Sequence, residues 1–146
     1  MALDRIDRQI LSLLQADGRM TNVELADRVG LTAPPCLRRV RALEEAGAIK
    51  GYHAELDPAT LGYSLQAIVR IRPLPGKLHI VQKLIEEIPE FVECDKVTGD
   101  DCFVARLYLR SIGQLDGILD RIAEKAETST SIVKSQPIRR RLPPLD

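Results

Sequence analysis

The chain has 146 residues and a formal net charge of zero, from 21 basic and 21 acidic side chains. Its hydrophobic fraction of 45% argues against wholesale disorder, and its aromatic fraction of 3% predicts cores built from aliphatic side chains. Zero net charge excludes a uniformly basic nucleic-acid binder of the histone type but permits a local basic patch. The length allows one ordinary domain or two small ones.

The cysteines and the N-terminus predict the compartment. Cys36, Cys94 and Cys102 are odd in number and form no CxxC pair, which favours reduced thiols over a disulfide framework. The N-terminal MALDRIDRQILSLLQ is charged from Asp4 on, unlike a signal peptide, and no apolar run approaches the length of a membrane span. We therefore expect a soluble, cytoplasmic protein that has no membrane partner.

Apolar spacing over the first thirty residues predicts two short helices. The first has Asp4 as its N-cap and Gly18 as a left-handed residue at its end. The second begins at Thr21 and Glu24, which have capping-box spacing, and ends at Gly30. The expected apolar faces are Ile6, Ile10, Leu13 and Leu14 in the first helix and Val23, Leu25, Ala26 and Val29 in the second.

The stretch LTAPPCLRRVRALEEAG, residues 31–47, predicts a third helix. Thr32 is its expected N-cap, and Pro34 and Pro35 fall in the first turn, where a missing N–H costs little. Gly47 is expected to end it. At 100° per residue, the side expected to be buried comprises Ala33, Cys36, Leu37, Val40 and Leu43.

Three arginines lie on the remaining side of this helix. A supporting helix followed by two short helices and a tight turn is the pattern of a helix-turn-helix, whose second helix enters the major groove. Arg38 would bond a guanine edge through two donors, and Arg39 and Arg41 would lie near the phosphates. The alternative is a merely solvated helix face; the three-helix layout favours contact with double-stranded DNA.

The segment after this helix predicts a connector. AIKGYHAEL, residues 48–56, is typical of a short strand or wing, and turn chemistry at Asp57-Pro58 and Gly62 predicts a hinge. We expect a helix-turn-helix domain over residues 1–52, a connector over 53–62 and a second domain over 63–146.

The second half alternates between strand and helix patterns. YSLQAIVRIRP and CFVARLYLR alternate with period two, and FVECDKVT and TSTSIVKS are further strand candidates. Helical stripes run from Leu78 to Ile88 and from Leu115 to Ala126, the latter preceded by capping-box spacing at Ser111 and Gln114. The order β-α-β-β-α-β predicts a ferredoxin-like domain, so the fold class is α+β with a winged helix-turn-helix in front.

Both helices of that arrangement cover one side of a four-stranded antiparallel sheet. The other side would carry Ile68, Val104 and Tyr108 among Arg70, Arg106 and Arg110. A lone domain can leave such a mixed face in water, and the alternative is that two copies pack through it as a dimer.

Two parts of the chain match a known pattern. The segment LDRIDRQILSLLQADGRMTNVELADRVGLTAPPCLRRVRALEEAGAIKGYHAELDPATLGY resembles the DNA-binding half of the Lrp/AsnC, or feast/famine, transcription regulators. VTGDDCF and TSIVKS resemble the loop and the last strand of the effector-binding half. The resemblance implies a transcription regulator that senses an amino acid, forms dimers through its C-terminal sheets and assembles further, up to octamers, with effectors bound between subunits.

The resemblance also assigns roles to residues. The DNA-reading segment becomes Thr32, Ala33, Pro34, Pro35, Arg38, Arg39 and Arg41. Effector contacts fall on Thr98, Gly99, Asp100, Asp101 and Cys102, with Thr130 and Ser135 as weaker candidates. Asp100 or Asp101 can pair with the ammonium group of an amino acid, and loop amides such as that of Gly99 can meet its carboxylate. Without the family, these acidic side chains are typical of a solvated turn.

The loop departs from the family pattern at two residues, and this departure bears on which effector can bind. Members often have a GDYDY-like run in this loop, whereas Asp101 and Cys102 occupy the corresponding places here. A carboxylate one residue early and a thiol in place of a carboxylate predict an altered choice of effector.

Two other functional classes, an enzyme and a metal sensor, are the alternatives. A tetrapyrrole-processing enzyme, similar to siroheme decarboxylases, would need histidines with partners, and the chain has only His53 and His79 and no nucleophile–base motif or phosphate loop. A metal sensor would use Cys94, Cys102 and His79, whose spacing matches no finger. We expect no catalytic residues, no metal and no cofactor.

Overall fold

The computed structural model describes residues 1–145. The chain forms two compact units, one of Met1–Glu55 with the C-terminal segment from Arg140, the other of Leu56–Arg139. The C-terminal segment contacts the first unit, where Arg8 Nη1 donates a hydrogen bond to the carbonyl of Leu145. No helix within residues 1–145 combines the length and apolarity that a bilayer crossing requires.

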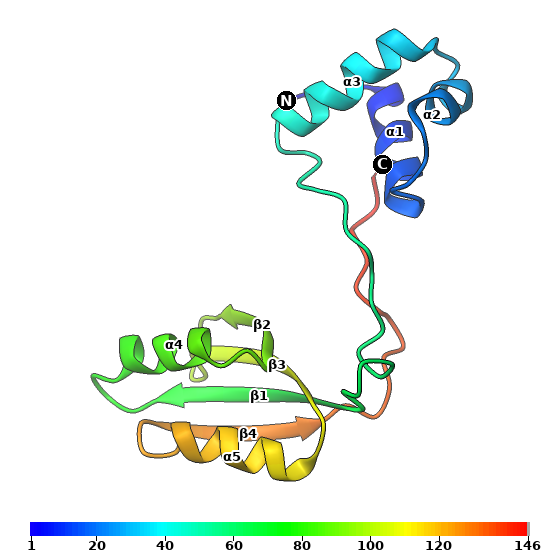
Figure 1. Ribbon diagram of the computed structural model, residues 1–146. Coiled ribbons are helices and arrows are strands. Elements are labelled where there is room, and N and C mark those ends of the chain that lie inside the picture. Colours follow the sequence, from blue (N-terminus) through cyan, green and yellow to red (C-terminus); the bar gives the residue numbers. More distant parts are fainter. Residues whose placement is uncertain (146) are drawn as a thin grey trace. The chain divides into compact units, whose positions relative to one another are not determined.

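Three helices form the first unit: α1 (Arg5–Ala16), α2 (Asn22–Val29) and α3 (Ala33–Glu45) (Figure 1). The predicted N-caps Asp4, Thr21 and Thr32 stand directly before them. At the start of α2, the Glu24 amide donates to Thr21 Oγ1 (3.2 Å) and the Thr21 amide donates to Glu24 Oε2 (3.1 Å). This reciprocal capping box is the one that the sequence predicts.

One aliphatic core joins the three helices. Its buried residues are Ile10, Leu25, Ala26, Val29, Cys36, Val40 and Leu43. Cys36 is fully buried, as its position on the predicted helix requires, and this burial raises the pKa of its thiol.

Several local predictions for the first unit are wrong. α1 ends at Asp17 in an extended conformation, where the Asp17 side chain accepts from the Arg19 amide, so Gly18 adopts no left-handed conformation. Val23 and Leu37 are exposed because narrower stripes than expected suffice to fill the core. Residues 48–56 form no strand, since an extended segment needs a hydrogen-bonded neighbour to become one.

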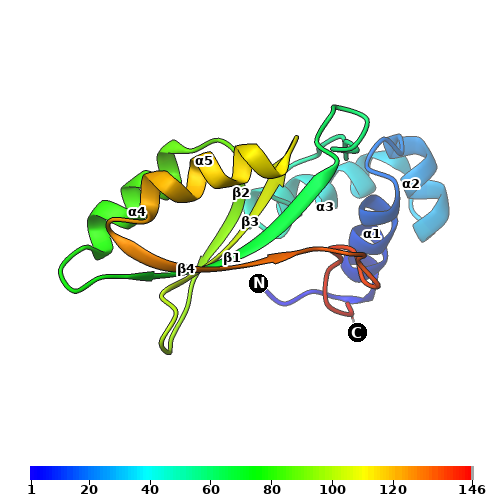
Figure 2. The same ribbon diagram turned by 90° about the horizontal axis from the view of Figure 1, so that it is seen from below.

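The second unit has the predicted β-α-β-β-α-β order. Its elements are β1 (Leu65–Pro73), α4 (Leu78–Glu87), β2 (Phe91–Lys96), β3 (Phe103–Leu109), α5 (Ile112–Ile122) and β4 (Ala126–Ile132). The strands form an antiparallel sheet in the order β2-β3-β1-β4. α4 and α5 cover one face of this sheet, and the other face is uncovered (Figure 2).

Period-two alternation decides which side chains face the helices. Val69 of β1 pairs with Ala105 of β3, and Ala67 pairs with Leu107; all four are buried beneath α4 and α5. The predicted last strand at residues 128–135 is shifted: β4 runs over Ala126–Ile132, so Ser135 lies beyond it. The shift follows from pairing, because Ala126 finds a partner in Pro73, at the end of β1.

Candidate functional site

The surface of α3 that faces away from the core carries two unengaged arginines. Arg38 and Arg41 are exposed, while Cys36, Val40 and Leu43 hold the opposite side of the 13-residue helix in the core. Within residues 1–145 neither guanidinium forms an ion pair or a hydrogen bond. We call the surface formed by Arg38 and Arg41 the outer face of α3.

The first turn of α3 is held by α2. Asn22 Nδ2 donates to the carbonyl of Ala33 at 2.8 Å, while Asn22 Oδ1 is buried without a partner among the described atoms. Thr32 and Pro34 are exposed beside this contact, and Ala33 and Pro35 are half-buried. The hydroxyl of Thr32 makes no cap hydrogen bond, so this side chain remains available to another partner.

Arg39 is engaged inside the first unit. Its Nη1 lies 2.7 Å from Asp4 Oδ2 and 3.0 Å from Asp7 Oδ1, both at the start of α1. The charge of Arg39 is thus paired within the chain, and its predicted place beside the phosphates stays a prediction. The helical period does not predict this contact, since it gives the direction of a side chain but not the neighbour that the side chain meets.

The contact shifts the pKa of Asp4 and the pKa of Arg39. Hydrogen bonds from the Asp7 amide and from Arg39 hold the pKa of the Asp4 carboxyl below its ordinary value of 3.8, and the two carboxylates raise the pKa of the Arg39 guanidinium. Because the pKa of Asp4 is lower in the folded state, its carboxylate stabilises the fold fully at pH values above 3.8. That contribution is lost as the pH falls through the lower, folded-state pKa.

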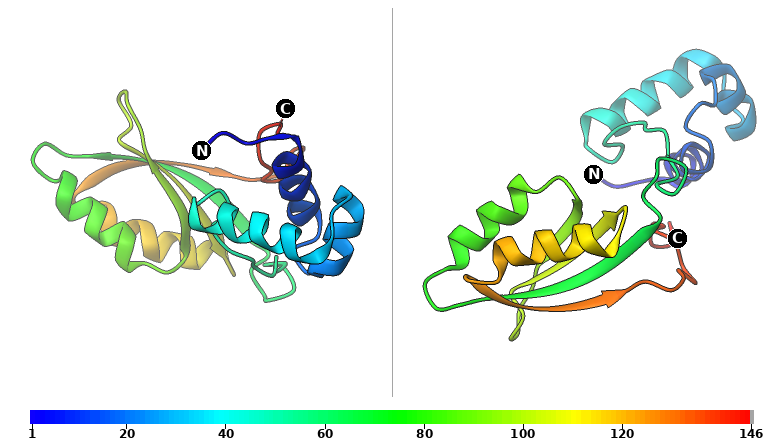
Figure 3. Two further views of the ribbon diagram at one scale, coloured as in Figure 1. Left: turned by 90° about the horizontal axis from the view of Figure 1, so that it is seen from above. Right: turned by 60° about the horizontal axis from the view of Figure 1, so that its bottom comes forward.

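Five of the predicted effector residues, Thr98, Gly99, Asp100, Asp101 and Cys102, lie on one hairpin loop. The hairpin loop, residues 97–102, joins β2 to β3 and projects from the sheet on the side away from α4 and α5 (Figures 2 and 3). The Val97 amide donates to the Cys102 carbonyl at 2.9 Å, and Gly99 turns the chain with a φ of 102°. Thr98, Gly99 and Asp100 are exposed, and Asp101 and Cys102 are half-buried.

Arg72, near the end of β1, anchors this loop. Its Nε donates to the carbonyl of Asp100 at 3.1 Å, and its Nη2 lies 3.7 Å from Asp101 Oδ1. A third contact joins Arg72 Nη1 to Oε2 of Glu127, its cross-strand neighbour on β4, at 3.8 Å. This role cannot be predicted from the sequence alone, because it depends on the strand register.

The structure does not bring Ser135 to the hairpin loop. The loop leads into Phe103, which pairs with Ile71, whereas Ile132 pairs with Ala67, four residues back along β1 and about 13 Å away at the rise of a strand. Ser135 continues in the same direction. Thr130 pairs with buried Val69, so its side chain points to the helix-covered face, opposite the side on which the loop projects.

The candidate metal-ligating residues are not gathered. Cys94 is exposed on β2, Cys102 ends the hairpin loop and His79 is exposed on α4. Over residues 1–145, no group of three or more His, Cys, Asp or Glu is placed to hold a metal ion.

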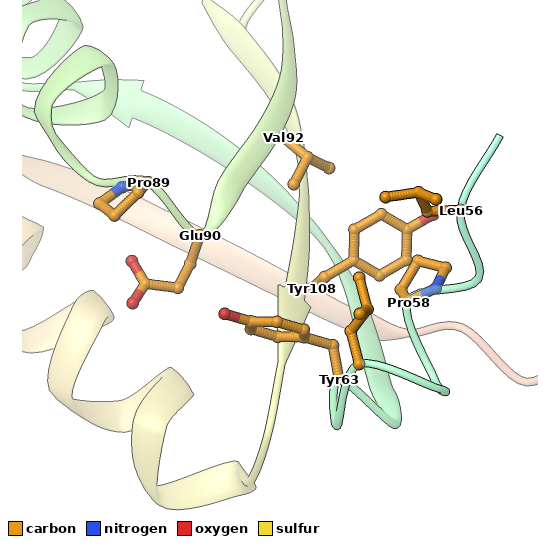
Figure 4. Close-up of a pocket in the computed structure, with 8 residues that line it drawn as sticks. Leu56, Pro58, Tyr63, Pro89, Glu90, Val92 and Tyr108 are labelled. Atoms are coloured by element: carbon orange, nitrogen blue, oxygen red, sulfur yellow. The ribbon is translucent and has the colours of Figure 1, made fainter. Parts of the chain in front are cut away.

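A cavity of about 300 Å³ is a separate feature of the second unit (Figure 4). Its lining comprises Leu56, Pro58, Leu61, Tyr63, Pro89, Glu90, Val92 and Tyr108. The hydroxyl of Tyr63 points toward Glu90 (Figure 4), and the Arg110 guanidinium lies 4.3 Å from the centroid of the Tyr63 ring. None of the predicted effector residues, all within the described chain, lines this cavity.

Both units match domains of known protein families. Residues 3–50 match the model of winged helix-turn-helix DNA-binding domains, and residues 66–143 match that of the Lrp/AsnC ligand binding domain. The chain is 64% identical over 69 residues to the leucine-responsive regulatory protein of Rhizobium meliloti, covering 47% of this chain and 44% of that protein. It is 48% identical over 101 residues to the Escherichia coli protein of the same name, covering 67% and 62% respectively.

These two matches span less than two thirds of the length of the curated relatives. A solved structure, the complex of a Neisseria meningitidis transcriptional regulator with L-methionine, has a TM-score of 0.91 and 30% identity, covering 99% of this chain and 98% of that one. These relatives are named as regulators, so the tetrapyrrole-enzyme alternative finds no support among them.

The Arg72 anchor predicts the mobility of the hairpin loop. Arg72→Gln removes the charge that holds Asp100 and Asp101, so hydrogen exchange of the Val97 amide should speed up about 2- to 10-fold, the worth of one ordinary hydrogen bond. Arg70→Gln is the matched control, since Arg70 is exposed on the same face of the same strand and has no ion-pair partner within residues 1–145. Equal exchange rates in both variants, measured by NMR, would contradict the anchor.

Proposed function

Because the chain belongs to the Lrp/AsnC family of DNA-binding transcription regulators, we propose that it regulates transcription by placing α3 in the major groove of DNA. The observation that carries this proposal is the outer face of α3, where Arg38 and Arg41 are exposed and unpaired within residues 1–145. A B-form major groove accommodates one helix. The cytoplasmic localisation expected from the sequence is part of this proposal.

The two arginines have different tasks in this proposal. Arg38 lies nearer the N-terminal turns, which enter the groove first, and its fork of donors suits O6 and N7 of guanine. Arg41 lies one turn later and suits a phosphate. Thr32, Ala33, Pro34 and Pro35 complete the DNA-reading segment at the first turn of α3, where the two prolines fix the direction of the helix.

Substitution separates these tasks. Arg38→Ala should weaken binding by about 1–3 kcal/mol and relax preference at one base pair, because it removes a base-edge contact. Arg41→Ala should weaken binding to all sequences and reduce the slope of log K against log salt by about 0.9, because it removes one phosphate contact. Fluorescence anisotropy on a duplex selected in vitro with the wild-type protein measures both. Unchanged affinity in both variants would end the DNA proposal.

The second unit senses a small molecule in this proposal, and the expected effector is an amino acid. Relatives are named leucine-responsive, and the Neisseria meningitidis neighbour holds L-methionine. Asp100 is exposed and offers its carboxylate to an ammonium group, and the backbone at Gly99 offers amides to a carboxylate. Asp101 shares its charge with Arg72, so Asp100 is the stronger candidate.

The positions of the other effector candidates determine what each could contribute to the site. Thr98 and Cys102 flank the turn and shape the space beside it. Thr130 faces the helix side of the sheet and Ser135 lies toward the far end of β4, so neither belongs to an effector site formed by a single chain.

A thermal-shift screen of the twenty amino acids tests the effector proposal. A ligand that binds only the folded state should stabilise it by about 2.7 kcal/mol at one hundred times its dissociation constant, which raises the melting temperature by several degrees. Asp100→Asn should remove the shift, and Asp116→Asn, an exposed carboxylate of α5, should not. A flat screen would remove the effector proposal and leave the DNA proposal standing.

Two copies of the chain associate through the uncovered face of the sheet in this proposal. Ile68, Val104 and Tyr108 lie on that face, where Gln66 Nε2 and the Tyr108 hydroxyl are 3.2 Å apart. The apolar side chains are half-buried by their own neighbours, which leaves part of their surface for a partner. Two-fold pairing of this kind implies palindromic DNA sites, and further assembly to octamers is the family expectation.

A charge on this face should break the dimer. Ile68→Glu would bury an unpaired carboxylate between the sheets and raise the dissociation constant of the dimer about 100-fold or more. Ile80→Glu is the control, because Ile80 is exposed on α4, on the other side of the sheet. Sedimentation velocity over a concentration series distinguishes them, and identical dimerisation of both variants would contradict the interface.

A further inference from the structure

The start of α1 carries a closed set of polar contacts. Asp4 and Asp7 form a capping box, in which the Asp7 amide donates to Asp4 Oδ1 at 2.8 Å and the Asp4 amide donates to Asp7 Oδ2 at 3.1 Å. The second oxygen of each carboxylate accepts from Nη1 of Arg39, at 2.7 and 3.0 Å. All four carboxylate oxygens therefore accept a hydrogen bond, and Arg39 links the two carboxylates to α3.

Burial makes this contact costly to break. Asp7 is only 8% exposed and is the one charged residue within residues 1–145 that the structure buries. Among residues 1–145, Arg39 is the only cation paired with Asp7, so removing Arg39 would leave a buried carboxylate uncompensated. To reach a phosphate, the Arg39 guanidinium would have to leave the Asp7 carboxylate, which would then be buried without a cation.

The contact also holds α3 against α1. Arg39 joins the two helices one residue along the chain from Arg38, so the contact lies close to the base of the Arg38 side chain.

We propose that Arg39 is a positioning residue, which ties α3 to the start of α1 and so aims Arg38 into the groove without itself contacting DNA. This rests on the proposed function of α3 as the DNA-reading helix. A base-edge contact of two donors requires a fixed side-chain direction, whereas a phosphate contact tolerates a looser one. Loss of the tie should therefore reduce the preference for a selected duplex over a random-sequence duplex.

The experiment measures this preference in the full chain, as the ratio of affinities for a duplex selected in vitro with the wild type and a random-sequence duplex. Arg39→Gln and Asp7→Asn should each lower the ratio about tenfold, and the double variant should lower it no further, since both changes remove one interaction. Arg39→Gln should leave the salt slope unchanged. Arg41→Gln, the matched control, should reduce the slope by about 0.9 and leave the ratio unchanged.

A phosphate contact by Arg39 predicts the opposite pattern. Arg39→Gln would then lower both affinities equally and reduce the salt slope, and Asp7→Asn would leave the ratio at its wild-type value; either result overturns the proposal. Circular dichroism at the assay temperature shows which variants are folded. If Asp7→Asn unfolds the first unit, Asp4→Asn replaces it, because Asn caps a helix as well as Asp and this change still removes one carboxylate from Arg39.

Failure of the proposed function gives a different result. A wild-type chain that binds no duplex, or an Arg38→Ala variant with full preference for the selected duplex, contradicts the role of α3. Normal behaviour of the Arg38 and Arg41 variants combined with an unchanged ratio in folded Asp7→Asn contradicts only the role of Arg39.

Discussion

The apolar stripe of α3, formed by Cys36, Val40 and Leu43, has to be buried, because an isolated 13-residue helix is marginal in water and this unit has few other side chains for a core. Burial against α1 and α2 orients the whole helix about its axis. Arg38 and Arg41 are exposed for that reason, and the proposed contact with DNA is a consequence of packing as much as of charge. The buried side chains of α3 thus determine which of its other side chains are exposed to a partner.

Polar contacts complete the orientation that burial begins. Asn22 holds the carbonyl of Ala33 at the first turn, and Arg39 holds the middle of the helix to Asp4 and Asp7. An exposed ion pair contributes at most about 1 kcal/mol, which is the upper bound for the contact with half-exposed Asp4. The contact with buried Asp7 matters more, because an unpaired carboxylate at that place would be costly.

The second unit divides its tasks between two faces of one sheet. The face beneath α4 and α5 holds the core, in which Val69 and Ala105 pair across β1 and β3. The other face keeps charged and apolar side chains together, and the hairpin loop projects on that side, held by Arg72. Because pairing between copies and effector binding are both proposed for the side that no helix covers, ligand binding and assembly can influence each other through short distances.

The sequence by itself determined the order of the elements, the N-caps of the first three helices and the buried residues of both units. These features depend on neighbours within a few positions: Asp4 caps the helix that follows it, and Ala67, Val69 and Ile71 alternate within one strand. The family resemblance carried the function further than any single pattern. The exposed state of Arg38 and Arg41 also followed from the helical period alone.

Only the tertiary structure decided the partners of Arg39 and Arg72 and the separation of Ser135 from the hairpin loop. Arg39 meets carboxylates 32 and 35 residues away, and Arg72 meets the Asp100 carbonyl 28 residues away. Val23 and Gly18 were misjudged for a related reason, since the packing of neighbouring helices and the path of the chain after α1 decide exposure and conformation there. Periodicity specifies the direction of a side chain, but the group that it meets is set by the packing and register of elements distant in sequence.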